Sequence, residues 1–503
     1  MDRRTFNQSL LGAGIAASLP SSVLAAAVRS ATRITTDINA ITRTGGETTV
    51  TKAALKEFQA SLRGPLIMPG NANYEAARQV WNGMIDKHPA MIARCTGSAD
   101  VMQAVDFARD NDLLVAVRGG GHSISGKGVC EGGLVIDLSA LRGCRVDPET
   151  KTARLAGGSL LGDLDHETQA FGLATTSGTV SHTGAGGLTL GGGHGRLARS
   201  LGLSCDNVLS VDIVTPDGQL RRASADENSD LYWGVRGGGG NFGVVTSFEF
   251  QLHEVGPMVY GGTLTYPIAQ AAELLPFYAD FIEDAPNQLT VDVIMLSPPG
   301  GKGFVGLSVC YNGDLKKGEK ALEPLRKFLK PAIDHVGPIS YEELQTTADA
   351  STPPGRQYYN KSGLMKKLDE GAIDALVERL VSTRNPDDPA VASNVIIQHL
   401  GGAMGQIPPG DTAYVHRDAR HDLLILSAWD NPEYDEQNIA WLRQGFEAIE
   451  PYTIGSYSNH LVDSDKNKAQ RAFRGNYERL VKLKNKYDPD NLFHLNANVK
   501  PTV

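Results

Sequence analysis

A histidine that follows three consecutive glycines is the most informative chemical feature of this sequence. The motif Arg118-Gly119-Gly120-Gly121-His122-Ser123 comes directly after Leu113 to Val117, a short apolar run typical of a strand. Glycines adopt backbone conformations closed to other residues, and their N–H groups can converge on anionic oxygens such as those of a diphosphate. The motif therefore predicts an anion-binding loop with an imidazole beside the bound group. The alternative is a tight turn with a hydrogen-bonded structural histidine.

A second glycine pattern, Gly238-x-Gly240-x-x-Gly243, matches the G-x-G-x-x-G motif of nicotinamide-binding folds. In those folds the motif leaves a strand and begins a helix. Here Gly243 is followed by Val244 to Phe250, whose β-branched and aromatic residues are typical of a strand. The context therefore argues against a nicotinamide cofactor.

Five motifs, in order along the chain, resemble the berberine bridge enzyme-like flavoproteins of the vanillyl alcohol oxidase superfamily. They are Arg118 to Ser123, Gly178 to Gly193, Cys205 to Val208, Gly238 to Val245, and Asn476 to Phe493. The resemblance covers almost everything from about residue 71 onward. It implies an α+β fold: a p-cresol methylhydroxylase-type FAD-binding domain of two subdomains, a substrate domain over the isoalloxazine ring, and a C-terminal return to the first domain.

The resemblance also implies which residues hold FAD. In the family, the histidine after the three glycines is bonded to the flavin 8α-methyl group, and here that residue is His122. A neutral imidazole, whose ordinary pKa is near 6.5, is the nucleophile that such a bond needs. Some relatives add a second bond through a cysteine, but Val180 stands at that position, so we expect a single covalent link. The other residues expected to bind the cofactor are Arg118, Gly119, Gly120, Gly121, Ser123, Gly178, Thr179, Thr183, Gly186, Gly187, Gly191, Gly192, Asn207, Gly243, Val245, Asn496 and Asn498.

Polar residues in the last quarter of the chain are the candidates for catalysis. By ungapped spacing back from His416-Arg417, Gln406 falls where the plant alkaloid enzymes carry a catalytic glutamate, and an amide cannot act as a base at neutral pH. His460 stands where many relatives carry a catalytic tyrosine, and imidazole is the better base at neutral pH.

Tyr457 is the alternative to His460. It lies two residues from Asn459, on the same face of a strand predicted over 454 to 462. Two further histidines, His182 and His194, lie in glycine-rich loops, where they either line the site or are structural. No histidine spacing suggests metal ligands.

The elements that position these residues fall into two blocks. Residues 71 to 255 contain the glycine clusters and form the predicted FAD-binding domain. Residues 256 to 453 alternate strands with helical stretches, which predicts an antiparallel sheet covered by helices on one face, the substrate-binding domain. Residues 454 to 503 are the predicted return to the FAD-binding domain. The polar, threonine-rich residues 28 to 70 are predicted to be a leader or surface segment, and Asp163, Asp165 and His166 the solvated face of one short helix.

Composition and the N-terminus restrict the partners and the compartment. The chain has 503 residues with 48 basic and 57 acidic side chains, so its net charge of −9 argues against nucleic acid. The sequence contains no run of about 20 apolar residues, so no segment is predicted to span a membrane. Arg3-Arg4, the apolar stretch Leu10 to Leu19 and Ala25 to Ala27 resemble a twin-arginine signal over residues 1 to 27, so we expect a periplasmic or secreted protein. The five cysteines form no C-x-x-C pair, and a Cys130 to Cys144 bridge is left open.

These observations lead to one expected function and two alternatives. The chain is expected to be an FAD-dependent oxidase that takes a hydride from a C–H bond next to an alcohol or amine of a small organic substrate and reduces molecular oxygen to hydrogen peroxide. The small side chain of Thr183, which by resemblance lies near the face where oxygen reacts, favours an oxidase. The alternatives are a dehydrogenase with a non-oxygen acceptor and a flavoprotein that sequesters a ligand without turnover. The sequence names neither the substrate nor the oligomeric state.

Overall fold

The computed structural model describes residues 34 to 297, 303 to 382, 392 to 462 and 468 to 503. The predicted signal over residues 1 to 27 lies outside these ranges. Among the described residues, no helix combines the length and apolar character needed to cross a membrane. The same residues include no group of acidic, histidine and cysteine side chains placed to hold a metal ion. Cys130 and Cys144 are both free thiols, so the bridge left open by the sequence does not form.

The first part of the FAD-binding region is a small sheet covered by helices. Strands β4 (Met91–Arg94) and β5 (Val115–Arg118) run parallel to β6 (Leu134–Asp137), which lies between them, and β3 (Leu66–Ile67) pairs antiparallel with β4. Helix α5 (Ser98–Asp110) buries residues at the spacing of one helix face, Val101, Ala104, Val105 and Ala108, in the core shared with this sheet. This packing fixes the end of β5, from which the glycine loop leaves.

Much of the segment predicted as a surface leader belongs to this same layer. Strands β1 (Ile38–Ile41) and β2 (Glu47–Val50) form a hairpin, and helix α3 (Lys52–Ser61) follows. Leu55 and Phe58 are buried, and Phe58 stacks on Phe107 of α5 at 4.0 Å. The prediction is wrong from residue 38 onward, because a few well-spaced apolar positions are enough to dock an otherwise polar hairpin and helix.

The second part of the FAD-binding region is an antiparallel sheet in the order β11-β10-β12-β8-β7. Its strands are β7 (Cys144–Asp147), β8 (Thr152–Ala156), β10 (Val208–Val214), β11 (Leu220–Ser224) and β12 (Val244–Gln251). Helices α6 (Leu161–Gln169) and α9 (Ser229–Val235) share its core. Strand β12 begins directly after Gly243, so the strand predicted at this position is confirmed. This strand is the feature that argued against a nicotinamide-binding motif.

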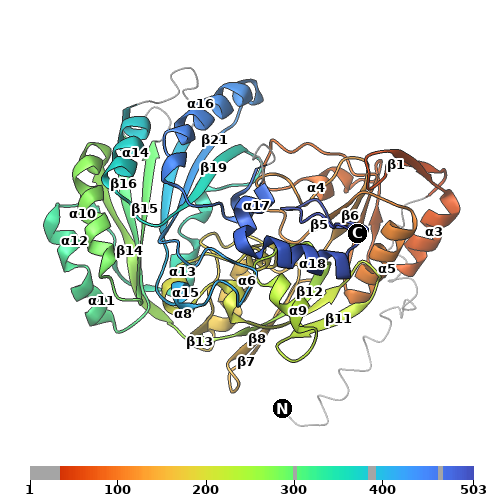
Figure 1. Cartoon of the computed structure of the whole chain (residues 1–503), viewed down its shortest axis with the longest axis horizontal. Helices are drawn as coiled ribbons and strands as arrows, with labels where there is room; N and C mark the ends of the chain where they lie inside the picture. The colour runs from red at the N-terminus through yellow and green to blue at the C-terminus, as the bar shows by residue number, and fades with distance from the viewer. Residues whose placement is uncertain (1–33, 298–302, 383–391, 463–467) are drawn as a thin grey trace, which may run out of the picture.

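The predicted substrate domain is one antiparallel sheet with helices over its outer face, as expected from the sequence (Figure 1). The order along the main path is β17-β14-β16-β15-β20-β21-β19, with β18 paired to β14. The strands are β14 (Met258–Pro267), β15 (Leu289–Ser297), β16 (Phe304–Tyr311), β17 (Ile333–Asp334), β18 (Gly337–Ser340), β19 (Gln357–Met365), β20 (Ala392–His399) and β21 (His421–Trp429). The covering helices are α10 (Ala271–Glu283), α11 (Leu315–Ala321), α12 (Glu323–Phe328), α14 (Glu370–Ser382) and α16 (Asp435–Glu447). The opposite face of the sheet is turned toward the FAD-binding region.

The C-terminal segment returns to the FAD-binding region, with α17 (Lys468–Phe473) and α18 (Tyr477–Tyr487) lying over it (Figure 1). The prediction of a strand over residues 454 to 462 is wrong. The chain makes one bridge, between Gly455 and Leu364, and then a 3₁₀ turn, η6 (Ser458–His460). The backbone turns here because Asn459 donates to the carbonyl of Leu188 in the glycine-rich segment.

A fully buried ion pair anchors this return. Lys484 Nζ lies 2.6 Å from Asp488 Oδ2 and also donates to the carbonyls of Asn241 and Phe493. Burial lowers the pKa of Lys484, whereas the Asp488 carboxylate raises it. The cation is therefore tolerated only because three oxygens surround it.

We predict that Asp488→Ala lowers the free energy of unfolding by about 3 to 5 kcal/mol, because it leaves a buried cation without its counter-ion. The double variant Lys484→Met/Asp488→Ala removes both charges and is expected to recover much of this loss. Urea unfolding of the two variants and the wild type measures the difference. Equal destabilisation by the single and double variants would show that the carboxylate does not act through Lys484.

Candidate active site

His122 is held where two glycine-rich segments touch. Strand β5 ends at Arg118, and Gly121 has a φ of +68°, which glycine adopts without strain. A Cβ added to Gly120 would lie 2.5 Å from the backbone of Gly184, so only glycine permits this approach. The contact brings the loop after β5 against the segment that contains His182.

Two aromatic side chains hold the His122 ring. Trp81 stacks on it with 4.4 Å between ring centroids, and His122 Nε2 lies 3.1 Å from Nδ1 of His182. Burial, and then the neighbouring His182, lowers the pKa of His122 to about 4. The imidazole is therefore neutral at physiological pH, which a nucleophile requires.

Unpartnered polar atoms beside the glycine loops fit a large polar cofactor. Arg118 donates through Nη1 to the carbonyl of Ala77, whereas its Nε is buried without a hydrogen-bond partner among the described residues. The side-chain oxygens of Asn496 and Asn498 are buried in the same way, and Asn496 donates to the carbonyl of Gly240. A guanidinium beside a glycine loop suits a diphosphate, and the amide oxygens can accept from ligand N–H or hydroxyl groups. The residues present therefore fit FAD.

The other predicted cofactor-binding residues differ in their surroundings. An added Cβ would come no closer than 3.6 Å to other protein atoms at Gly119, and it would meet none within 4 Å at Gly187, so both backbones are open to a ligand. An added Cβ would come within 3 Å of protein atoms at Gly178, Gly186, Gly191, Gly192 and Gly243. Tight packing is a sufficient reason for glycine at those five positions. Along these segments, Ser123, Thr179 and Thr183 are partly exposed, and Val245 is buried in β12.

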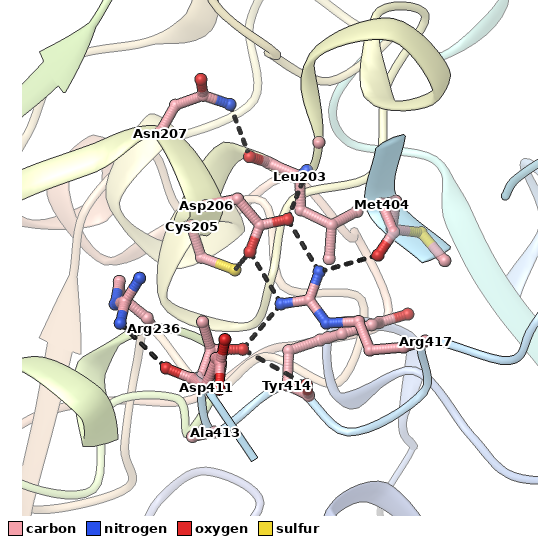
Figure 2. A network of polar contacts seen from close by, with 12 residues as sticks. Leu203, Cys205, Asp206, Asn207, Arg236, Met404, Asp411, Ala413, Tyr414 and Arg417 are labelled. Atoms are coloured by element: carbon pink, nitrogen blue, oxygen red, sulfur yellow. Dashed lines mark hydrogen bonds and ion pairs between the residues drawn. The ribbon is translucent and has the colours of Figure 1, made fainter. Parts of the chain in front are cut away.

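The Cys205-Asp206-Asn207 motif joins the two domains (Figure 2). Asp206 accepts from both Nη atoms of Arg417, each at 2.7 Å, and both side chains are almost completely buried. Asn207 donates to the carbonyls of Leu201 and Leu203 and accepts from His253. Its side chain, predicted to bind the cofactor, makes these three hydrogen bonds within the protein.

Asp206 also lines a surface cavity of about 560 Å³. On its wall, the guanidinium of Arg479 lies 3.8 Å from the ring centroid of Trp233. None of the lining residues belongs to the segments around His122 or His460. The cavity is therefore separate from the residues predicted to carry the chemistry.

A buried carboxylate joins two histidines at the boundary between the domains. Asp422 Oδ2 lies 2.9 Å from Nδ1 of His194 and 3.3 Å from Nδ1 of His460. The side chain of Asp422 is fully buried, that of His194 is 2% exposed and that of His460 is 21% exposed. Burial alone would raise the pKa of Asp422, but His460 and His194 together hold it well below its ordinary value. The carboxylate is therefore ionised, and His460 is the histidine that a substrate can reach.

Two tyrosines surround His194. Its Nε2 shares a hydrogen bond of 2.9 Å with the hydroxyl of Tyr414, and its ring stacks on Tyr457 at 3.8 Å. The hydroxyl oxygen of Tyr457 accepts from the backbone N–H of Gly193 at 2.9 Å and from the Asn459 amide at 2.8 Å. Burial raises the pKa of Tyr457 well above its ordinary value. Tyr457 is thus a buried, neutral phenol whose oxygen already accepts two hydrogen bonds.

The sheet of the substrate domain presents a mixed polar and apolar surface beside Asp422. The register places Gln398 of β20 opposite Asp422 of β21, and Asn394 opposite Leu426, so these side chains share a face. Residues on this face that keep partial exposure are Ile294, Leu296, Asn394, Ile396, Gln398 and Leu424. The alternate residues, including Val395 and Ile397, pack into the core under the helices. A small organic molecule can therefore contact amides and aliphatic groups here, with a carboxylate and histidine pair at one end.

Gln406 is not part of this surface, which corrects the sequence-based placement. It is exposed at the end of the short helix α15 (Ala403–Gln406). The spacing count failed because the chain leaves β20 through Gly401 and Gly402, and the glutamine on the inner face is Gln398. Alternation along β20 is the signal that would have identified Gln398, and Asp422 follows His421 at the start of the next strand.

Asp165 is buried, so its predicted place on a solvated helix face is wrong. Its carboxylate accepts from the hydroxyl of Ser177 and from the amide of Gln345 in the substrate domain. Gln345 also donates to the carbonyl of Gly178, at the start of the second glycine-rich segment. Burial raises the pKa of Asp165 to about 7.

Comparisons with known proteins agree with the fold. Residues 89–224 match the family model described as an FAD binding domain, and residues 456–500 match the model "Berberine and berberine like". An FAD-linked oxidoreductase of Dictyostelium discoideum is 33% identical over 452 residues, which span 89% of this chain and 97% of that protein. The crystal structure of 6-hydroxy-D-nicotine oxidase from Arthrobacter nicotinovorans superposes with a TM-score of 0.81 at 27% identity, covering 88% of this chain and 98% of the other. Xylooligosaccharide oxidase from Myceliophthora thermophila superposes with a TM-score of 0.79 at 25% identity, covering 90% and 100%.

The raised pKa of Asp165 predicts how stability changes with pH. The folded protein keeps this proton up to about pH 7, whereas an unfolded aspartate loses it near pH 3.9. The stability gained from the protonated side chain is therefore present below the unfolded pKa and is lost as the pH rises through the folded pKa. Asp165→Asn keeps a neutral side chain, so its stability relative to wild type is expected to increase between about pH 4 and pH 7.

Thermal unfolding of Asp165→Asn and wild type across this pH range measures the effect. Asp163→Asn is the matched control, because Asp163 lies on the same helix but pairs with Arg142 at the surface. Parallel pH profiles for wild type and Asp165→Asn would contradict the assignment of a buried, protonated carboxyl.

Proposed function

Because the chain belongs to the berberine bridge enzyme-like family of FAD-linked oxidoreductases, we propose that it is an oxidase that removes a hydride from a C–H bond next to an alcohol or amine. Molecular oxygen is the proposed acceptor, and hydrogen peroxide the product. The observation that carries the proposal is the Asp422 and His460 pair, placed at the end of a partly exposed sheet face that is turned toward the FAD-binding region. The oxidase names of the two structural relatives support this reaction class.

FAD, when bound, supplies the hydride acceptor and passes the electrons on to oxygen. His460 is the proposed general base. Nδ1 of His460 lies 3.3 Å from Oδ2 of Asp422, an ion-pair contact, so this nitrogen is proposed to carry the proton and Nε2 to accept one from a substrate hydroxyl or amine. Asp422 then stabilises the imidazolium that forms, as a carboxylate does in other histidine dyads. His194 holds the carboxylate from the other side and so fixes its position.

Tyr457 and Asn459 are proposed to position the base. The Tyr457 phenol has a raised pKa and accepts two hydrogen bonds, which favours His460 as the proton acceptor. The ring of His460 packs edge-on against Tyr457 at 4.9 Å, and its backbone carbonyl accepts from Asn360 of β19. Tyr457 directly precedes the 3₁₀ turn that His460 ends, and this turn brings the two side chains together.

The two alternatives predict different behaviour of the flavin. A dehydrogenase with another acceptor would be reduced by its substrate and stay reduced in air, and a sequestering protein would not be reduced at all. An oxidase is expected to bleach under anaerobic conditions and to regain its colour when air is admitted. Anaerobic screening of small alcohols, sugars and amines for flavin reduction therefore tests the proposal and identifies the substrate class.

We also propose that the protein is exported through the twin-arginine route, on the strength of Arg3-Arg4 and the apolar stretch that follows. This route accepts folded proteins and so suits a chain that binds its cofactor before export.

FAD is expected to be attached through His122 alone, since Val180 offers no thiol for a second bond. Acid precipitation of the wild type should leave flavin on the polypeptide, and His122→Ala should release it. Flavin fluorescence of the denatured protein after gel electrophoresis measures the attached fraction. Covalent flavin in His122→Ala would assign the link to another residue.

His460→Ala is expected to slow flavin reduction by a factor of about 10² to 10⁴ at saturating substrate, the usual contribution of a general base. Asp422→Asn is expected to slow the same step, because the imidazolium loses its counter-ion. Tyr457→Phe should cause a smaller loss, since it removes only a positioning hydroxyl. Anaerobic stopped-flow absorbance measures the three rates, and equal reduction rates in His460→Ala and wild type would transfer the role to Tyr457 or to solvent.

A further inference from the structure

Two histidines and a carboxylate meet at the proposed attachment point from three separate segments. His122 follows β5, His182 lies before α7 (Ala185–Leu190), and Asp349 begins η3 (Asp349–Ser351) in the substrate domain. The rings of His122 and His182 are 5.0 Å apart and tilted by 37°, with Nε2 of the first 3.1 Å from Nδ1 of the second. The expected link between His122 and FAD does not by itself explain why His182 lies against His122.

We propose that His182 accepts the proton that His122 loses when it bonds to the flavin, an inference that rests on the proposed covalent link. Because Nε2 of His122 faces His182, Nδ1 is the ring nitrogen left to form the bond. The lone pair on Nδ1 is available when the proton is on Nε2, and that proton then lies directly on the path to His182.

The reaction balances as follows. One bond forms, between Nδ1 of His122 and the 8α carbon of the flavin. One methyl C–H bond and the imidazole N–H bond break, and both hydrogens leave as protons, the methyl proton to solvent and the imidazole proton to Nδ1 of His182. The electron pair of the broken C–H bond stays on the isoalloxazine ring system, from which molecular oxygen removes it to give hydrogen peroxide.

The surroundings keep the two rings in this arrangement. Trp81 stacks on His122 and restricts its rotation. Asp349 accepts from the backbone N–H of Ser181 at 2.9 Å and from the Ser181 hydroxyl at 2.5 Å, which anchors the residue before His182. Burial and His182 lower the pKa of His122, whereas the negative charge of Asp349 raises it. Asp349 therefore stabilises the positive charge that develops during attachment.

The other nitrogen of His182 adds a second reason to regard it as more than a packing residue. Its Nε2 is buried and has no hydrogen-bond partner among the described residues. Leaving a buried nitrogen unpaired carries a desolvation cost, which an apolar side chain at this position would avoid. A role for the imidazole in chemistry explains why a histidine stands here.

The test follows attachment over time. Wild type, His182→Ala and His182→Gln are produced in riboflavin-limited cells, given FAD in air and sampled at intervals. Fluorescence of the denatured polypeptide measures covalent flavin, and absorbance of the native protein after gel filtration measures total bound flavin. Both variants are expected to bind FAD yet to attach it at least about tenfold more slowly. Added imidazole should accelerate attachment in His182→Ala, which a purely structural role for His182 does not predict.

The variants separate proton transfer from hydrogen bonding. Glutamine keeps an acceptor but does not take up the proton, so attachment at the wild-type rate in His182→Gln, or in His182→Ala, would overturn the proposal. His166→Ala is the control, because His166 is an exposed histidine paired with Glu342, and it should attach FAD at the wild-type rate. Absence of covalent flavin from the wild type would instead refute the link through His122, which distinguishes the two failures.

Discussion

The candidate active site depends on the buried ion pair between Arg417 and Asp206. Asp206 belongs to the glycine-rich half of the FAD-binding region, and Arg417 precedes the strand that carries Asp422. Breaking such a pair by removing one partner typically costs about 3 to 5 kcal/mol, because the other charge is left buried. Arg417 also lies over the ring of Tyr414, whose hydroxyl meets His194. The pair therefore fixes the distance between the first domain and β21, and with it the geometry around Asp422.

The two histidine clusters show how burial and charge produce opposite behaviour from the same side chain. His122 is buried beside another histidine, so its pKa falls and it remains a neutral nucleophile. His460 instead lies beside an ionised carboxylate and is partly exposed, so a substrate can reach it. In the proposed function, the first cluster would react once, with the cofactor, and the second would act on the substrate in each turnover.

Sequence patterns predicted the fold and the glycine-rich loops well but the inner face of the substrate-domain sheet poorly. The glycine motifs are local: Gly120 must be glycine because another backbone lies 2.5 Å from its would-be Cβ, and that requirement is visible in the sequence. Asp422 and His194 are 228 residues apart, and nothing local indicates that they meet. The spacing back from His416-Arg417 leads to Gln406, which lies off the inner face, because counting residues ignores where a strand ends. Asp165 appeared solvated because its partner Gln345 belongs to the other domain.

The separation of roles along β20 and β21 explains how one scaffold can serve different substrates. Val395 and Ile397 hold the helices on the outer face, whereas Asn394 and Gln398 alternate with them and point toward the FAD-binding region. Replacing the inner residues removes no contact from the core beneath the helices. Such changes are therefore expected to lower the free energy of unfolding by far less than the about 2 to 5 kcal/mol typical of truncating a large aliphatic residue in a core. The His460 and Asp422 pair is tied to the first domain through His194 and does not share this freedom. Substrate preference can therefore change on the inner face of the sheet while the proton acceptor stays in place.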